Sequence, residues 1–154
     1  GKLDMVKLLR EFQQFFRENS ESWAERFDYK EAGFQLLLQA FLQRIVNGGG
    51  LIGREYALGR KRVDLLVRWR LNVQAQGGGE QRIVLELKTL RENSAGAERT
   101  LADGLEQTAR YADLSNASEA HLMVCDERRG KSWDEKIYDR FEHRNGREIH
   151  VWGV

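Results

Sequence analysis

The sequence predicts an α/β domain in which helices cover a mixed β-sheet. In the first 46 residues, apolar side chains recur at every third or fourth position, the spacing of amphipathic helices. From residue 51 onward apolar residues alternate, as in β-strands, and later segments change between the two spacings. Strands joined by short loops pair antiparallel, whereas a strand reached through a helix can lie parallel. The order of the segments therefore predicts a mixed sheet.

Two helices are expected at the start of the chain. The first spans residues 3–18, and its apolar stripe consists of Met5, Leu8, Leu9, Phe12, Phe15 and Phe16. The second runs from about Tyr29 to Val46, and its stripe consists of Phe34, Leu37, Leu38, Phe41 and Ile45. Asn19-Ser20 and the glycines at 48–50 are expected to end these two helices.

The rest of the chain alternates between strands and helices. We predict three consecutive strands at 51–58, 62–71 and 81–88, joined by a turn at 59–61 and a glycine-containing loop at 72–80. We then predict a helix at 100–114, a strand at 120–125, a short helix at 134–143 and a strand at 148–154. Because no repeat or linker divides these segments, we expect a single domain, residues 1–154, with a helical extension at 1–28 before a core at 29–154.

The composition excludes several classes of protein. With 41% hydrophobic and 32% charged residues, the chain is neither collagen-like nor disordered. It has no apolar run long enough to span a membrane and no signal peptide, and its one cysteine cannot form an internal disulfide. These features predict a cytoplasmic protein, and the initial Gly1 indicates a piece of a longer one. Because the net charge is only +1, contact with nucleic acid must come from local basic patches.

Three charged residues interrupt the apolar pattern of two neighbouring strands. Glu86 and Lys88 are two positions apart, so their side chains project to the same face of the strand. Asp64 interrupts the apolar run of the preceding strand. If the two strands pair around the loop at 72–80, Asp64 and Glu86 can lie close together on one face. Since burial of unpaired charges is unfavourable, the three residues indicate either a strand end open to solvent or a functional site.

Metal binding would explain why two carboxylates are brought together. Close carboxylates repel, and one tends to keep its proton unless a cation lies between them. Mg²⁺ or Mn²⁺ prefers such oxygen ligands, and the backbone carbonyl of Leu87 could supply another. The metal would activate a water molecule and offset the charge of a phosphate. Lys88 would orient or deprotonate that water or stabilise the transition state, so Asp64, Glu86 and Lys88 predict metal-assisted hydrolysis of phosphodiesters.

These residues resemble a known pattern. Asp64 followed after a hairpin by Glu86-Leu87-Lys88 is similar to the D…ExK signature of the PD-(D/E)xK nuclease superfamily, and the order of elements fits that superfamily's αβββαβ core. Other segments resemble the nuclease-like domain at the carboxyl end of a group of prokaryotic AAA-type ATPase proteins. These segments are Gly53–Arg60, Val63–Val67, Leu105–Thr108, Tyr111 and Val151–Gly153.

The resemblance covers residues 29–154 and implies a restriction-endonuclease-like fold. It also implies a magnesium cofactor, a DNA substrate and an ATPase region that precedes this segment in the full protein. One position departs from the pattern, because Val63 stands where the superfamily name indicates proline.

Three polar residues on the predicted helices are further candidates. Glu31 shares a helix face with Phe34, and the superfamily often places a glutamate from this helix near the metal; the alternative is a capping-box partner for Asp28. Gln107 and Tyr111 share one stripe of the later helix. Gln107 is either a surface glutamine or a residue that reaches the site or a phosphate oxygen, and the resemblance favours the site role. Tyr111 is expected to contact nucleic acid or to pack at the rim.

A basic cluster before Asp64 is the candidate surface for phosphate groups, although such a run is commonly a solvated turn. The residues are Arg54, Arg60 and Lys61. The histidines are scattered along the sequence without metal-ligand spacing, so we interpret them as structural or surface residues. Cys125 lies in a predicted buried strand and is interpreted as inert packing.

Three functions are compatible with these features. The first is a metal-dependent deoxyribonuclease in which Asp64 and Glu86 bind the metal, Lys88 acts on the water, and Glu31 and Gln107 support them. The alternative is an inactive nuclease-fold module that binds nucleic acid or regulates an attached ATPase. The third is a protein-interaction domain that docks through the helix at 3–18. The complete acidic and lysine set favours the enzyme, because a decayed site usually loses one of these residues.

Overall fold

The computed structural model describes residues 1–24, 31–46, 50–58, 61–71, 79–92 and 96–154, with the side chains at 20–24, 31–34, 45–46, 50–58 and 61–63 outside that description. The elements are α1 (Met5–Ala24), α2 (Glu31–Val46), β1 (Gly50–Leu58), β2 (Lys61–Arg70), β3 (Glu80–Leu90), α3 (Ala97–Leu114), β4 (Glu119–Asp126), α4 (Trp133–Lys136), β5 (Tyr138–Arg144) and β6 (Arg147–Gly153). The predicted αβββαβ order, from α2 to β4, is confirmed.

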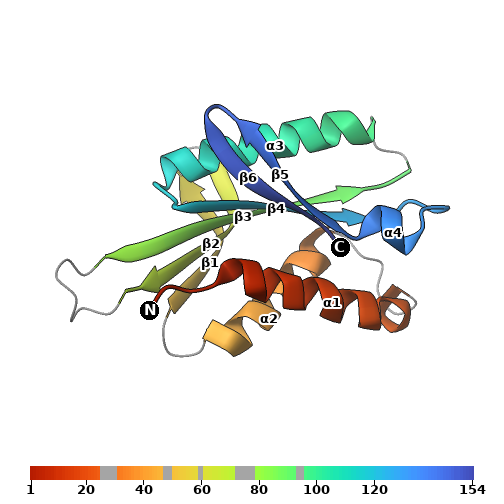
Figure 1. The fold of residues 1–154 in the computed structure, drawn as a ribbon, viewed down its shortest axis with the longest axis horizontal. Helices are drawn as coiled ribbons and strands as arrows, with labels where there is room; N and C mark the ends of the chain where they lie inside the picture. The colour runs from red at the N-terminus through yellow and green to blue at the C-terminus, as the bar shows by residue number, and fades with distance from the viewer. Residues whose placement is uncertain (25–30, 47–49, 59–60, 72–78, 93–95) are drawn as a thin grey trace.

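The strands form one mixed sheet in the order β1-β2-β3-β4-β6-β5. β1, β2 and β3 pair antiparallel, β4 lies parallel to both β3 and β6, and β5 pairs antiparallel with β6. Helix α3 lies on one face of this sheet, and α1 and α2 lie on the other (Figure 1). This arrangement is the predicted restriction-endonuclease-like α/β fold with an additional amino-terminal helix.

Each face of the sheet has its own hydrophobic core. On the first face, Phe12 of α1 and Leu38 of α2 pack with odd-numbered residues of β3, among them Leu85. On the opposite face, Leu105 of α3 packs with even-numbered residues such as Val84. Because side chains alternate along a strand, the even-numbered positions of β3 all project toward α3. The face that carries α3 is therefore the one that receives Glu86 and Lys88.

The carboxyl-terminal third contains a strand where a helix was predicted. The predicted helix at 134–143 is wrong, because α4 ends at Lys136 and residues 138–144 form β5. The two residues after β5 explain the difference. Asn145 and Gly146 have φ values of 53° and 74°, the left-handed conformation of a two-residue hairpin turn, which joins β5 to β6. The pairing with β6 prevails over the charged, helix-compatible composition of this segment.

Helix α1 also runs further than predicted, to Ala24 instead of residue 18. The side-chain amide of Asn19 donates to the carbonyl of Phe15 at 2.8 Å, so this residue satisfies the helix backbone instead of ending it. Among the helices in the described part of the chain, none is both long and apolar enough to cross a membrane.

Candidate active site

The candidate site lies where β2 and β3 stop pairing. The β2–β3 ladder ends at Leu65 opposite Leu85, and Asp64 and Glu86 are the next residues on the two strands. Strand β3 continues past this point and stays paired with β4 as far as Leu90. The backbone N–H groups at the end of the ladder therefore need other partners.

The two carboxylates supply those partners reciprocally. The backbone N–H of Asp64 donates to Oε1 of Glu86 at 3.1 Å. The backbone N–H of Leu87 donates to Oδ2 of Asp64 at 2.9 Å. Each acidic side chain thus holds the backbone of the opposite strand, and both carboxylates are fixed on the face that carries α3.

Burial and mutual repulsion make Glu86 an unusual acid. The residue is only 3% exposed to solvent. Burial, followed by the negative charge of Asp64, raises the pKa of Glu86 to about 9, and Lys88 only partly opposes this rise. Near neutral pH the metal-free pair therefore holds a proton, and a divalent cation would relieve the same repulsion.

Lys88 approaches the site beneath α3. A Cβ added to Gly104 would lie 3.0 Å from Cγ of Lys88, so the missing side chain of Gly104 leaves space for the lysine stem. Sequence reasoning gave Gly104 no role. A glycine inside a helix lowers helix stability by about 1 kcal/mol relative to alanine, and this unfavourable choice is a signal of close packing.

Tyr111 faces the carboxylates from the same helix. Burial raises the pKa of its hydroxyl, and the negative charges of Glu86 and Asp64 raise that pKa further. Gln107 lies one turn before Tyr111 and is half-buried. The structure gives the Gln107 amide no hydrogen bond within the described residues, so its contact with the site stays a prediction.

Gln35 of α2 supports the site from the other face of the sheet, and sequence reasoning missed it. The residue is buried, and its side-chain amide donates to the backbone carbonyl of Asp64 at 2.9 Å. A glutamine among apolar residues of a buried helix stripe is the signal that could have identified it. Glu31 begins α2 one turn earlier, but its side chain lies outside the described residues.

The predicted basic residues are placed only in part. Residue 60 lies outside the described residues altogether, as do the side chains of Arg54 and Lys61. The backbone of Arg54 pairs with Leu65, next to Asp64, and Lys61 begins β2. Their contact with phosphate groups stays a prediction.

The described residues supply two carboxylates to the site. In the part of the chain that the structure describes, no group of three or more His, Cys, Asp or Glu side chains is arranged so that it could hold a metal ion. Magnesium is commonly held by one or two carboxylates with waters and substrate oxygens, so this donor set suits it. The carbonyl of Leu87 as a further ligand stays a prediction.

Two of the histidines that the sequence analysis described as scattered lie together. The rings of His121 and His150 are 5.7 Å apart, and Nε1 of Trp152 donates to Nδ1 of His121 at 3.1 Å. This bond leaves Nε2 of His121 to donate to Glu119, also at 3.1 Å. The expectation that these histidines are structural fits their burial. Cys125 is buried as well, and burial raises the pKa of its thiol to about 12, as expected for inert packing.

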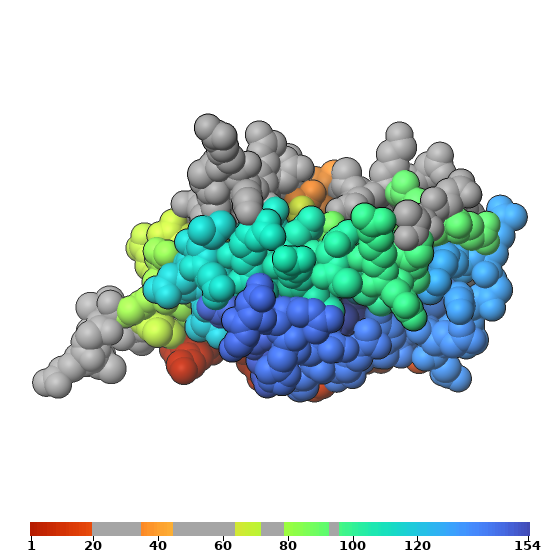
Figure 2. All heavy atoms as spheres, turned by 90° about the horizontal axis from the view of Figure 1, so that it is seen from above, coloured from red at the N-terminus to blue at the C-terminus, as the bar shows by residue number. Residues whose placement is uncertain are grey.

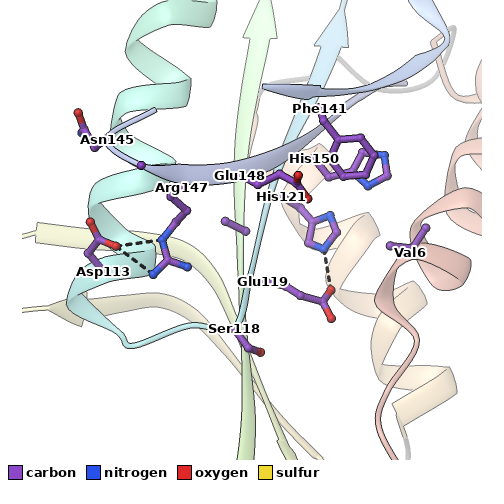
Figure 3. Close-up of a pocket in the computed structure, with 12 residues that line it drawn as sticks. Val6, Asp113, Ser118, Glu119, His121, Phe141, Asn145, Arg147, Glu148 and His150 are labelled. Atoms are coloured by element: carbon purple, nitrogen blue, oxygen red, sulfur yellow. Dashed lines mark hydrogen bonds and ion pairs between the residues drawn. The ribbon is translucent and has the colours of Figure 1, made fainter. Parts of the chain in front are cut away.

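A groove of about 550 Å³ lies at the amino-terminal end of β4 (Figure 3). Neither Asp64 nor Glu86 is among the residues that line it. Its walls include Glu119 and His121 of β4 and Phe141 of β5. Within it, Arg147 is held by Asp113 at 2.9 Å and by the carbonyl of Ala117. The charges on this wall are thus paired with each other, unlike the two carboxylates of the candidate site.

Comparisons with known proteins give little beyond this geometry. No family model and no curated protein matches the chain, so the predicted link to an ATPase region stays a prediction. Among solved structures, the chain is similar to the DNA modification-dependent restriction endonuclease AspBHI, with 18% identity and a TM-score of 0.34. The match covers 79% of this chain and 27% of that one. A likeness of this degree says nothing about chemistry, so the case for the site rests on its own residues.

Proposed function

We propose that the chain is a divalent-metal-dependent nuclease that hydrolyses phosphodiester bonds in DNA. The observation that supports this most strongly is the placement of the Asp64 and Glu86 carboxylates at one end of the β2–β3 ladder. A buried glutamate with a pKa raised to about 9 beside a second carboxylate is unfavourable for stability alone. Sites that perturb a pKa in this way are frequently functional.

Asp64 and Glu86 would hold a Mg²⁺ or Mn²⁺ ion. When bound, the ion would lower the pKa of a water molecule and neutralise charge on the scissile phosphate. The hydrogen bonds from Leu87 and Asp64 backbone groups fix both carboxylates before any ion arrives. This preorganisation reduces the free-energy cost of assembling the site.

Lys88 would act on the attacking water or on the phosphate. Its stem is confined between β3 and Gly104, which limits where the ammonium group can travel. An ammonium near the reacting phosphate can orient the water and stabilise negative charge in the transition state. Tyr111 and Gln107 would contact the substrate from α3, since the charges of both carboxylates act on Tyr111 and Gln107 lies one turn before it.

The proposed DNA contacts are Arg54, Arg60 and Lys61. These residues precede Asp64 in the sequence, and the net charge of +1 leaves local clusters as the source of attraction to phosphate. Contacts of this kind position the backbone of the nucleic acid without selecting a base sequence.

Cleavage of plasmid and oligonucleotide DNA with Mg²⁺ or Mn²⁺ tests the proposal. The wild-type protein should cut, and chelation of the metal should stop it. Asp64→Asn and Lys88→Met should each lower the rate by at least about a hundredfold. Asp113→Asn and Lys131→Met are the matched controls, because they make the same two substitutions at exposed positions outside the site. Both should cut like the wild type. Cleavage that survives both site substitutions would contradict the proposal.

Calorimetric titration with metal tests whether the two carboxylates bind an ion. Wild-type protein should bind Mn²⁺, and Asp64→Asn should bind it much more weakly because one ligand is lost. Metal binding and DNA binding without cleavage would instead favour the non-catalytic module.

A further inference from the structure

Strand β5 leaves one edge of the sheet open. In the described residues it pairs with β6 alone, and it is the last strand in the order of the sheet. In Figure 2 the β5–β6 hairpin, in blue, lies at the surface of the molecule next to α3. An open edge presents unpaired N–H and C=O groups that can pair with another strand.

The hairpin turn decides which residues present those groups. A two-residue turn at Asn145-Gly146 makes Arg144 and Arg147 a hydrogen-bonded pair. Alternation along β5 then directs the N–H and C=O groups of Asp139, Phe141 and His143 away from β6. The guanidinium of Arg144 donates to the carbonyl of His143 at 2.8 Å, which fits a carbonyl directed to the open edge.

The side chains of β5 are complementary to a second copy of the same strand. We infer that the chain forms a two-fold dimer in which β5 pairs antiparallel with β5 of another copy, centred on Phe141. This register places Asp139 opposite His143 of the partner subunit and Arg140 opposite Glu142 of the partner subunit. It also places Tyr138 opposite Arg144 of the partner subunit, which would allow a cation–π contact. Tyr138 already makes such a contact within the chain, because Cζ of Arg140 lies 5.0 Å from the centroid of its ring.

Other registers satisfy fewer of these requirements. Centring the pair on Asp139 would place like carboxylates opposite each other, and centring it on His143 would place Phe141 opposite Asn145 of the turn. A register centred between two residues would pair an outward-facing backbone with an inward-facing one. Only the register centred on Phe141 uses the whole strand and pairs opposite charges.

Exposure of the central residue supports the same register. Phe141 is 56% exposed although it is a large apolar side chain. Its inner surface packs against His150 with ring centroids 4.3 Å apart and the rings tilted by 35°, so the ring is held in place (Figure 3). A two-fold axis at Phe141 would cover its outer surface with the same ring of the partner subunit. The interface is isologous, as expected for a closed dimer.

Charge reversal within β5 provides a sharp test by sedimentation velocity over a series of protein concentrations. The wild type should shift with concentration toward twice the chain mass of 17.9 kDa. Arg140→Glu alone and Glu142→Arg alone should each weaken the dimer at least about tenfold, because each places like charges in two symmetric pairs. An equimolar mixture of the two variants should form a heterodimer, because opposite charges again face each other across the axis.

The mixture separates association from folding. Within each variant strand residues 140 and 142 keep like charges, so recovery in the mixture can come only from pairing between chains. Phe141→Pro is a second test, because it removes an outward N–H that β6 does not use; it should give a monomer. Arg99→Glu, an exposed change on α3, should leave the dimer intact. A wild type that stays monomeric up to several hundred micromolar would overturn the inference, as would variants or a mixture that behave like the wild type.

Discussion

Glu86 is a single residue whose position lowers the stability of the fold near neutral pH and at the same time forms part of the candidate site. It is buried on the face of the sheet that carries α3, and the charge that shifts its pKa most is that of another carboxylate, Asp64. Because burial and Asp64 raise its pKa from 4.5 to about 9, the folded protein binds a proton that the unfolded chain releases at much lower pH. The stabilising contribution is therefore complete below pH 4.5 and is lost as the pH rises toward about 9.

This linkage predicts the behaviour of Glu86→Gln. In metal-free buffer, the free energy of unfolding of the wild type should fall relative to the variant by on the order of a few kcal/mol across this pH range. Denaturant unfolding of both proteins at a series of pH values measures the difference. Mn²⁺ should restore wild-type stability at the alkaline end and leave the variant unchanged. If the two proteins keep a constant difference in stability at every pH, Glu86 is already ionised in the folded state.

At the scale of elements, the contact between α3 and β3 positions the site. The helix lies close to the sheet at Gly104, since an added Cβ would also lie 3.2 Å from a methyl group of Leu122. The helix therefore cannot carry a larger residue there without displacing Lys88 or Leu122. The loss of helix propensity at Gly104 is offset by the packing it allows.

Gly104→Ala tests this role of the helix. Alanine should raise helix propensity yet crowd Lys88, so stability should change little while cleavage falls by about tenfold or more. Asp103→Ala is the matched control, because it changes the neighbouring exposed position and does not meet Lys88. Thermal unfolding and cleavage rates of both variants measure the two effects. Unchanged cleavage by Gly104→Ala would mean that the added methyl group does not displace the side chain of Lys88.

At the scale of the whole molecule, a β5-paired dimer would place both candidate sites on one face. A two-fold axis perpendicular to the sheet keeps the α3 helices of both copies on the same side. Seven strand spacings separate the two β3 strands, which puts the sites on the order of 34 Å apart. This separation is comparable to one helical turn of B-DNA, about 34 Å.

If both proposals hold, the dimer should break both strands of one duplex in a single encounter. Wild-type protein should produce linear plasmid early in the reaction, whereas Glu142→Arg should accumulate nicked circles first. The mixture of Arg140→Glu and Glu142→Arg should recover early linear product. Agarose gels of a time course distinguish these outcomes; identical product orders for all three samples would rule out cooperation between the two sites.

The sequence alone predicted most of the fold. Amphipathic spacing identified both amino-terminal helices, and alternating apolar residues identified the first three strands. It also brought Asp64, Glu86 and Lys88 to attention, because charges inside apolar strands are rare without a reason. Local pattern failed at residues 138–144, where charged residues mask the alternation and only the Asn145-Gly146 turn indicated a hairpin.

Tertiary structure decided what the local pattern could not encode. The contact of Gln35 with Asp64 spans 29 positions of the sequence, and the space that Gly104 leaves for Lys88 exists only between a helix and a strand. The high pKa of Glu86 likewise depends on burial and on a neighbour from another strand. Periodicity reports which face of an element is apolar, whereas the neighbours of a side chain depend on how all the elements pack together.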